Sequence, residues 1–443
     1  MNELQQRFIR ARRQAIALNY QHLNDKQREA VLSTEGPLLL LAGAGSGKTT
    51  VIIQRIRRLT EKMGVSPYRI LVITFTKAAA EQMKTRYAAL QGKTGVMFGT
   101  FHSIFFRILR QACGYSLEQV LSEDERRNTM QKLVTEARIS VQDQEEYIQQ
   151  FFSQYSLMKN QLQDVSDFVP EGLPKDEFVA LTKKFDGWKR RNEKIDFDDM
   201  LTECYEVLSQ DEKTRKMWQD RFDYILVDEF QDVNRAQYAC LQMLAAPKNN
   251  LFVVGDDDQS IYRFRGADIG NILSFEEMFP GAKVIKLEQN YRSTQNILNA
   301  ANGVIRHNRG RKDKTLWTAN GEGDLIRFKQ FDTAREEADF VAREIRDSGY
   351  AYQEQAVLYR TNAQSRLLEE RCIFYNVPYR LVGGVNFYQR KEIKDILAYL
   401  KTVANGVDDL SVLRIINVPK RGIGATSMGR VTMFASEHGM SLY

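Results

Sequence analysis

The chain has 443 residues, of which 43% are hydrophobic and 27% are charged, as is ordinary for a globular protein with about two to four domains. Its formal net charge of +6 permits a polyanionic partner without requiring one, and no apolar run reaches the roughly 20 residues needed to span a bilayer, so we expect no membrane partner. The four cysteines and four histidines are scattered without the spacing of a zinc site or a disulfide framework, which favours a cytoplasmic location.

After a short basic helix over about Arg7 to Asn19, the sequence predicts a buried strand over residues 37–41, followed by a glycine-rich turn and a helix from about Thr50 to Glu61. Glycines let the backbone curl so that several N–H groups face an anion, and the helix adds its N-terminal dipole. Lys48 can reach the β- and γ-phosphates of a nucleoside triphosphate, and the hydroxyl of Thr49 can bind Mg²⁺. The predicted phosphate cradle comprises Ala42, Gly43, Ala44, Gly45, Ser46, Gly47, Lys48 and Thr49.

Strands and helices alternate from Pro37 through Gly99 and again from Tyr224 through Leu287, which predicts a parallel sheet wrapped by helices. The intervening sequence is highly charged and almost wholly helical in pattern. We therefore expect a first α/β core over residues 1–110 and 195–283, interrupted by a helical insertion domain over residues 111–194.

A second phosphate-chemistry element follows the predicted strand over residues 224–227. Asp228 would hold Mg²⁺, and Glu229 would orient and deprotonate the attacking water. Two acidic residues after a strand are a weak signal alone, since they often cap the next helix, but the glycine-rich turn in the same chain strengthens it.

A third predicted strand, over residues 251–254, leads into a loop in which the amide of Gln259 can sense a γ-phosphate. Tyr262 and Phe264 then alternate with Arg263 and Arg265, a pattern suited to stacking on unpaired bases and holding their phosphates. The alternative is that the aromatic rings pack a core and the arginines are solvated. The position directly after the Gln259 sensor favours the nucleic-acid interpretation.

Candidate strands over residues 284–287, 325–328 and 356–359 predict a second α/β core. We expect this core, incomplete in the present chain, over residues 284–390. From residue 391 to 443 the pattern turns helical again and predicts the start of a second helical insertion.

Several further segments between about Leu23 and Gly424 resemble, in the same order, the motifs of superfamily 1 DNA helicases of the UvrD/Rep/PcrA type. They are residues 23–31, 73–80, 99–103, 195–200, 227–232, 287–293, 357–362 and 387–393. The resemblance implies P-loop, RecA-like cores that use ATP and Mg²⁺ to move 3′ to 5′ along single-stranded DNA and to unwind duplex at single-strand/duplex junctions.

The resemblance also assigns individual roles. Gln27 would read the adenine edge, Tyr291 would stack on adenine, Arg292 would touch the γ-phosphate, and Thr50 would lie near the ribose. The implied catalytic residues are Lys48, Asp228, Glu229, Gln259 and Arg292. The implied DNA-binding residues are Phe75, Thr76, Phe101, His102, Phe197, Tyr262, Phe264, Arg265 and Asn362.

Two other functions stay open on the sequence alone. The family's later motif, whose arginine stabilises charge on the γ-phosphate, is not found in this sequence, so the chain could be an ATP- and single-stranded-DNA-binding fragment with little turnover. A metabolic P-loop kinase is a poorer alternative, because it leaves the loop of alternating aromatic and arginine residues unexplained.

Overall fold

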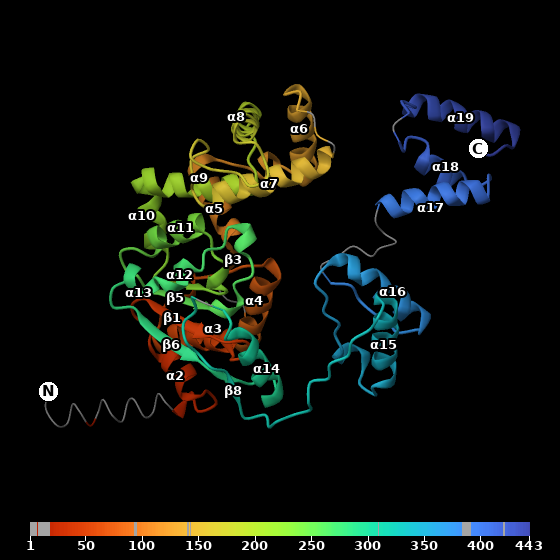
Figure 1. Cartoon of the computed structure of the whole chain (residues 1–443). Helices are drawn as coiled ribbons and strands as arrows, with labels where there is room; N and C mark the ends of the chain where they lie inside the picture. The colour runs from red at the N-terminus through yellow and green to blue at the C-terminus, as the bar shows by residue number, and fades with distance from the viewer. Residues whose placement is uncertain are drawn as a thin grey trace. The chain divides into compact units, whose positions relative to one another are not determined.

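The computed structural model describes residues 7, 18–92, 95–139, 141, 143–308, 310–382, 391–419 and 421–443. The basic helix expected over about Arg7 to Asn19 lies largely outside these ranges. The chain divides into two compact units, residues 1–326 and residues 327–443 (Figure 1).

The centre of the first unit is a six-stranded parallel sheet with the strand order β3-β2-β4-β5-β1-β6 (Figure 1). In that order the strands are β3 (Met97–Thr100), β2 (Ile70–Thr74), β4 (Tyr224–Val227), β5 (Leu251–Gly255), β1 (Leu38–Ala42) and β6 (Lys283–Leu287). The expected α/β class, with a parallel sheet of the RecA-like type, is confirmed. Because the strands are parallel, their carboxyl ends meet at one edge, where the loops after β1, β4 and β5 come together.

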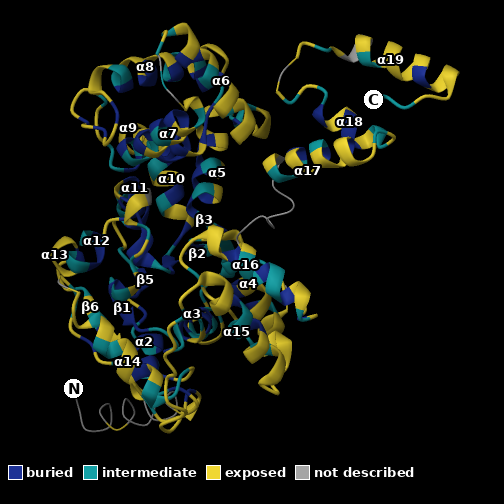
Figure 2. Cartoon of the chain, turned by 45° about the vertical axis from the view of Figure 1, so that its right-hand side comes forward, coloured by how far each residue is buried: buried dark blue, intermediate teal, exposed yellow. Residues whose placement is uncertain are grey.

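Helices bury both faces of the sheet, which explains why its strands read as continuous apolar runs rather than as alternating patterns (Figure 2). Leu39 and Leu41 point to one face, where they pack with three helices: α5 (Phe101–Cys113), α9 (Phe197–Gln210) and α11 (Arg235–Ala245). Leu38 and Leu40 point to the other face. There they pack with α2 (Asp25–Leu32), α3 (Lys48–Arg57) and α4 (Lys77–Gln91).

The segment between β3 and β4 is helical and has a hydrophobic core of its own. Its helices include α6 (Glu123–Glu136), α7 (Gln144–Asn160) and α8 (Lys175–Arg191). Phe151, Phe178 and Phe185 are fully buried at their centre, so the three helices pack as a subdomain rather than as separate surface elements. α10 (Glu212–Arg221) then leads back to β4 and buries Trp218 in the first core.

The strand expected to open a second core is part of the first sheet instead. β6 pairs in parallel with β1, with Leu39 opposite Val284, and buries Ile285 and Leu287. The short helices α12 (Gly270–Leu273) and α13 (Phe275–Met278) precede it, and its apolar side chains complete the open edge beside β1. The expectation was wrong because the apolar pattern of a strand predicts that it is buried in a sheet but does not say which sheet edge it joins.

The segments 325–328 and 356–359 are described but are not strands, so these two expectations were also wrong. Phe328 and Leu358 are 89% and 94% exposed, and β-branched or aromatic residues form a strand only where a neighbouring strand pairs with them. A second, two-stranded sheet pairs β7 (Gln289–Asn290) with β8 (Trp317–Thr318), and these short strands flank α14 (Gln295–Ile305).

The second unit is helical among its described residues. α15 (Ala334–Asp347) and α16 (Ser365–Phe374) pack around Ala342 and Cys372. α17 (Lys391–Ala404), α18 (Asp409–Ile415) and α19 (Ala425–His438) follow, as the helical pattern after residue 391 predicts. None of the helices in the described ranges has the combined length and apolar character that crossing a membrane requires. The expected domain boundaries stay predictions.

Candidate active site

The glycine-rich turn connects the end of β1 to the first residue of α3. Gly45 and Gly47 have φ values of +67° and +86°, a left-handed conformation that glycine adopts without strain. Gly47 is the N-cap of α3, so the N–H groups of the first turn of this helix have no partner within the helix. The hydroxyl of Ser46 donates to the carbonyl oxygen of Gly43 over 2.7 Å and closes the loop.

The cation of this turn meets the carboxylate that follows β4. Lys48 Nζ lies 2.9 Å from Glu229 Oε2, although 181 residues separate them in the sequence. Gln231 Nε2 donates to the same carboxylate oxygen, also over 2.9 Å. Burial acts to raise the pKa of Glu229, but Lys48 and Gln231 outweigh it and hold the pKa below its usual value. Glu229 is therefore ionised at neutral pH, as a general base must be.

Asp228 is buried beside this pair. Its Oδ1 atom has no hydrogen-bond partner among the described residues, and burial and the Glu229 carboxylate raise its pKa to about 6. A buried carboxylate oxygen without a partner is costly unless a cation approaches it, so Asp228 fits the role of a Mg²⁺ ligand.

Asp232 is a further carboxylate whose role the motifs did not predict. Its Oδ1 atom also lacks a partner in the described part of the chain, and burial and Glu229 raise its pKa to about 6. Its position in the sequence, four residues after Asp228 and on the 3₁₀ turn (Phe230–Asp232) that follows β4, could have indicated that Asp232 lies near the end of this strand.

A cavity of about 320 Å³ opens between the turn and the segment after β7. It is lined by Gly45, Ser46, Gly47, Lys48, Thr49, Thr50, Arg86, Glu229, Tyr291 and Arg292. The structure thus brings together most of the residues expected to bind nucleotide or metal, Thr49 included. Arg86, on α4, is a cation that sequence reasoning missed, because nothing in its local pattern distinguishes it from a surface arginine.

Four expected nucleotide-binding residues do not line this cavity but lie close to residues that do. Gln27 is buried, and its amide donates to the carbonyl oxygen of Ser46 over 2.9 Å. Ala42 ends β1, Ala44 accepts a hydrogen bond from the Asn290 amide over 2.6 Å, and Gly43 lies against Leu316.

Tyr291 connects the glycine-rich turn to the segment after β7. Its hydroxyl lies 2.8 Å from the Asn24 amide, and its backbone N–H donates to Gly45 over 2.9 Å. The aromatic ring is 48% exposed, so a base could lie against it.

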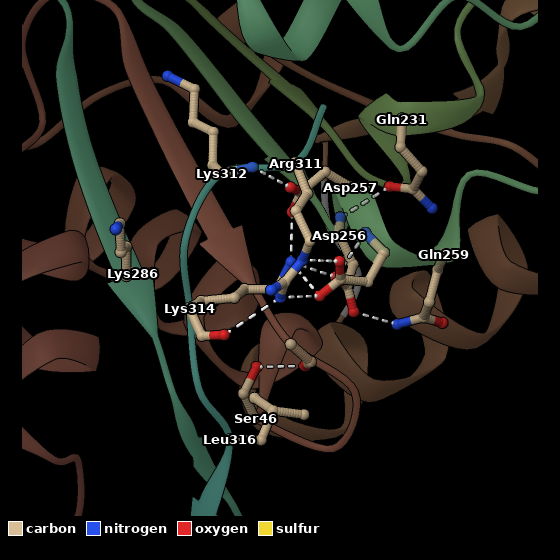
Figure 3. Close-up of polar contacts among 12 residues, drawn as sticks. Ser46, Gln231, Asp256, Asp257, Gln259, Lys286, Arg311, Lys312, Lys314 and Leu316 are labelled. Atoms are coloured by element: carbon tan, nitrogen blue, oxygen red, sulfur yellow. Dashed lines mark hydrogen bonds and ion pairs between the residues drawn. The ribbon is translucent and has the colours of Figure 1, made fainter. Parts of the chain in front are cut away.

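Gln259 does not line this cavity. It lies in an adjoining cavity of about 280 Å³, which is lined by Phe75, Thr76, Ala79, Asp228, Glu229, Gln231, Asp232, Gln259, Ile261 and Tyr262. The Gln259 amide donates to the carboxylate of Asp256 (Figure 3). The proposed sensor, the proposed metal ligand Asp228 and the first aromatic residues therefore share one space.

Three aromatic rings form a row along this second cavity. The ring centroids of Phe75 and Tyr262 are 5.0 Å apart, and those of Tyr262 and Phe264 are 6.0 Å apart. Phe264 is 67% exposed, Phe75 and Tyr262 are half-buried, and none of the three belongs to a hydrophobic core cluster of the described residues, which disfavours the alternative that these rings pack a core. Thr76 caps α4 by accepting a hydrogen bond from the Ala79 N–H over 3.1 Å, and this fixes where the helix starts beside Phe75.

The other expected DNA-binding residues are more dispersed. His102 and Phe197 form a second aromatic pair, with centroids 5.6 Å apart, and Phe197 is 49% exposed. Burial lowers the pKa of His102, so the ring is mainly neutral at pH 7. Phe101 is 3% exposed and packs on Phe105 in the core, because the first residue of α5 faces the sheet.

Two expected DNA-binding residues and one motif are not tested by this geometry. Asn362 is exposed and belongs to the second unit. The side chain of Arg265 and residues 387–390 lie outside the described part of the chain.

Comparison with known proteins supplies the family. The model of the UvrD/REP helicase N-terminal domain matches residues 23–280, and that of the UvrD-like helicase C-terminal domain matches residues 285–443. This chain belongs to the UvrD/Rep helicase family. The interpretation as an inactive fragment rested on the absence of a later motif of the family. The match of residues 285–443 to the C-terminal domain model disfavours that interpretation.

Two relatives within the family show the extent of the similarity. The ATP-dependent DNA helicase PcrA of Staphylococcus epidermidis is 47% identical over 435 residues, which cover 95% of this chain and 59% of the relative. The ATP-dependent DNA helicase PcrA of Staphylococcus aureus is 45% identical over 434 residues, with the same coverage. The chain thus spans about three fifths of the length of these UvrD/Rep relatives.

Proposed function

We propose that this chain is the ATP-hydrolysing and strand-binding part of a DNA helicase or translocase that moves 3′ to 5′ along single-stranded DNA. The observation that carries the proposal is the shared cavity, in which the carboxylates Asp228 and Glu229 face the same space as Phe75 and Tyr262. A site for hydrolysis alone would not need aromatic rings lining the space beside its carboxylates. A site for DNA alone would not need an ion-paired lysine on a phosphate-binding turn.

The residues around the first cavity support a division of work. The backbone N–H groups of the turn and Lys48 would hold the β- and γ-phosphates of ATP, and Tyr291 would hold the adenine. Gln27, which does not line this cavity, would support the turn through its hydrogen bond to Ser46. A γ-phosphate oxygen near Lys48 would compete with Glu229 for its ammonium group. Glu229 would then be free to accept a proton from the attacking water.

Asp228 and Thr49 would hold Mg²⁺, which when bound neutralises charge on the phosphate oxygens. Arg292 and Arg86 line the same cavity and would add positive charge near the phosphates.

The aromatic row would hold single-stranded DNA by stacking, which tolerates any base sequence. Gln259 lies between the hydrolytic carboxylates and this row, so a change at the γ-phosphate would be transmitted to Tyr262 within one loop. We expect the partners to be single-stranded DNA and single-strand/duplex junctions. We expect a cytoplasmic location, in keeping with four cysteines that are all free thiols.

The test is steady-state ATP hydrolysis by the purified chain with Mg²⁺, with and without a single-stranded oligonucleotide. We expect the oligonucleotide to stimulate hydrolysis, and Lys48→Ala to abolish both nucleotide binding and hydrolysis. The matched control is Lys62→Ala, an exposed lysine five residues beyond the end of α3, which should behave as the unmodified chain. Hydrolysis that is indifferent to Lys48, or to DNA, would contradict the proposal. Binding of both ligands without hydrolysis would favour the fragment alternative.

A further inference from the structure

A short extended segment, residues 311–318, lies across the loops of the active site (Figure 3). Its central residue, Lys314, has a side chain only 1% exposed. The Lys314 ammonium group lies 2.9 Å from Asp256 Oδ1 and 2.7 Å from Asp258 Oδ2, and it also binds Asp257. These carboxylates directly follow β5 and precede Gln259.

Lys314 occupies the position that a metal ion would take in this cluster. Carboxylate oxygens of the three aspartates lie within 4.8 Å of one another. So close together they would repel one another in a buried site without a cation. Arg311 adds two hydrogen bonds to Asp258, of 2.7 and 2.9 Å. Burial acts to lower the pKa of Lys314, but Asp256 and its neighbours outweigh it and raise the pKa, so the lysine stays charged.

From this cluster a continuous set of hydrogen bonds leads to the hydrolytic residues. The Asp256 carboxylate accepts a hydrogen bond from the Gln259 amide, and the Asp256 backbone N–H donates to Gln231 Oε1 over 3.0 Å. Gln231 Nε2 then donates to Glu229 Oε2 over 2.9 Å, and Glu229 pairs with Lys48. The position of Lys314 is therefore connected to both the proposed sensor and the proposed base.

The other end of the segment supports the opposite wall of the nucleotide cavity. Leu316 packs so closely on Gly43 that a Cβ atom there would lie 2.2 Å from its side chain. Trp317 and Thr318 pair with β7, where Asn290 bonds the carbonyl oxygen of Ala44 over 2.6 Å. The Asn290 side chain also accepts the Arg292 N–H over 2.8 Å.

We propose that Lys314 is a positioning residue for recognition of the γ-phosphate. Through Asp256 it holds the Gln259 amide in place, and through residues 316–318 it couples this loop to the segment that carries Arg292. The inference rests on the proposed function, because it assumes that the first cavity binds ATP. Its specific consequence is that Lys314 determines discrimination between nucleoside triphosphate and diphosphate rather than nucleotide affinity in general.

The experiment compares the dissociation constants of Mg²⁺·AMP-PNP and Mg²⁺·ADP for the full chain and its variants. In Lys314→Met we expect the affinity for ADP to change by less than about twofold and the preference for AMP-PNP to fall about tenfold, as for loss of one charge-assisted hydrogen bond. Lys314→Arg should restore most of the preference. Lys312→Met is the control, since its ammonium group binds Glu276 over 2.6 Å and not the aspartates.

Removal of Lys314 alone leaves two buried carboxylates and one half-buried carboxylate without this cation, which can prevent folding. The double variant Lys314→Met/Asp257→Asn restores the charge balance, and it should fold but still lack the preference for AMP-PNP. A wild-type preference in either folded variant would overturn the inference, as would equal binding of both nucleotides by the unmodified chain. Failure of both variants to fold would assign Lys314 to stability alone and also overturn it. If the unmodified chain bound neither nucleotide, the proposed function itself would fail.

Discussion

The ammonium group of Lys48 and the carboxylate of Glu229 form a 2.9 Å ion pair between the phosphate-binding turn and the end of β4. The lysine side chain is 15% exposed and the glutamate side chain 36% exposed, so the pair is only partly screened by water. The proposed phosphate ligand and the proposed base thus neutralise each other, and a bound phosphate would compete with Glu229 for the Lys48 ammonium group.

This relationship gives opposite expectations for binding and hydrolysis in Glu229→Gln. The variant retains the size of the side chain but removes the base, so hydrolysis should fall about 10²- to 10⁴-fold. Because Lys48 is released from its partner, Mg²⁺·ATP should bind as tightly as before or a few-fold more tightly. The measurements are steady-state hydrolysis and equilibrium nucleotide binding. Glu81→Gln, on the exposed side of α4, is the control. Weaker nucleotide binding in Glu229→Gln would refute the competition between Glu229 and phosphate.

Two aspartates that flank β4 should affect the pH dependence of stability in opposite directions. Burial and Glu229 raise the pKa of Asp228 from 3.8 to about 6. Ionisation of Asp228 therefore lowers the free energy of unfolding of the wild type as the pH rises from about 4 to about 6. Asparagine cannot ionise, so the free energy of unfolding of Asp228→Asn should rise relative to that of the wild type over this range, by about 2–3 kcal/mol at most.

Asp223, at the other end of β4, is the internal control. Hydrogen bonding from Arg69 and pairing with Lys248 lower its pKa to about 2. Its stabilising contribution is present above pH 4 and is lost as pH falls toward 2, so Asp223→Asn should be less stable than the wild type at neutral pH. Thermal unfolding between pH 4 and 8, without added metal, measures both variants. The same sign for both would contradict the burial argument for Asp228.

The aromatic row should account for single-strand binding. Tyr262→Ala and Phe264→Ala should each weaken binding of an oligonucleotide by about 1–3 kcal/mol. For the unmodified chain, the logarithm of the affinity should fall linearly with the logarithm of the salt concentration, with a slope of about 0.7 per phosphate contacted. Fluorescence anisotropy with a labelled single strand and with a blunt duplex measures both effects. Tyr68→Ala is the control, because Tyr68 is 73% exposed but precedes β2, whereas Phe75 follows it. Equal affinity for single strand and duplex would remove these rings from the DNA site.

A buried ion cluster should stabilise the helical insertion. Lys189 Nζ lies 2.6 Å from Asp199 and 3.1 Å from Asp196, and the lysine side chain is 3% exposed. Lys189→Met leaves these buried carboxylates with only the longer contacts to Lys159 and Arg126, of 3.3 and 3.7 Å, and should cost up to about 3–5 kcal/mol. Faster hydrogen exchange in α8 and α9 would report the loss, whereas Lys184→Met, exposed on α8, should have little effect. Unchanged protection in Lys189→Met would show that the cluster contributes nothing to local stability.

The chemistry of the site could be inferred from local sequence because each of its parts is local. A phosphate-binding turn requires glycines with positive φ at Gly45 and Gly47, a lysine at the helix start, and a buried strand before it, all within a dozen residues. The same holds for Asp228 and Glu229 at the end of an apolar strand. Parallel strands bring their carboxyl ends to one edge, so the convergence of these parts also followed from the sequence.

What the sequence alone could not determine depends on contacts between distant segments. The pairing of β6 with β1, the burial of Phe101 and the place of Lys314 among three aspartates depend on which edge, face or loop is nearest after the chain has packed. Lys314 looks like any surface lysine in a charged stretch, and only its burial against Asp256 gives it a role. Local pattern therefore determined which groups we propose to react, while tertiary packing decided their partners, because hydrogen bonds and ion pairs act only over a few ångströms.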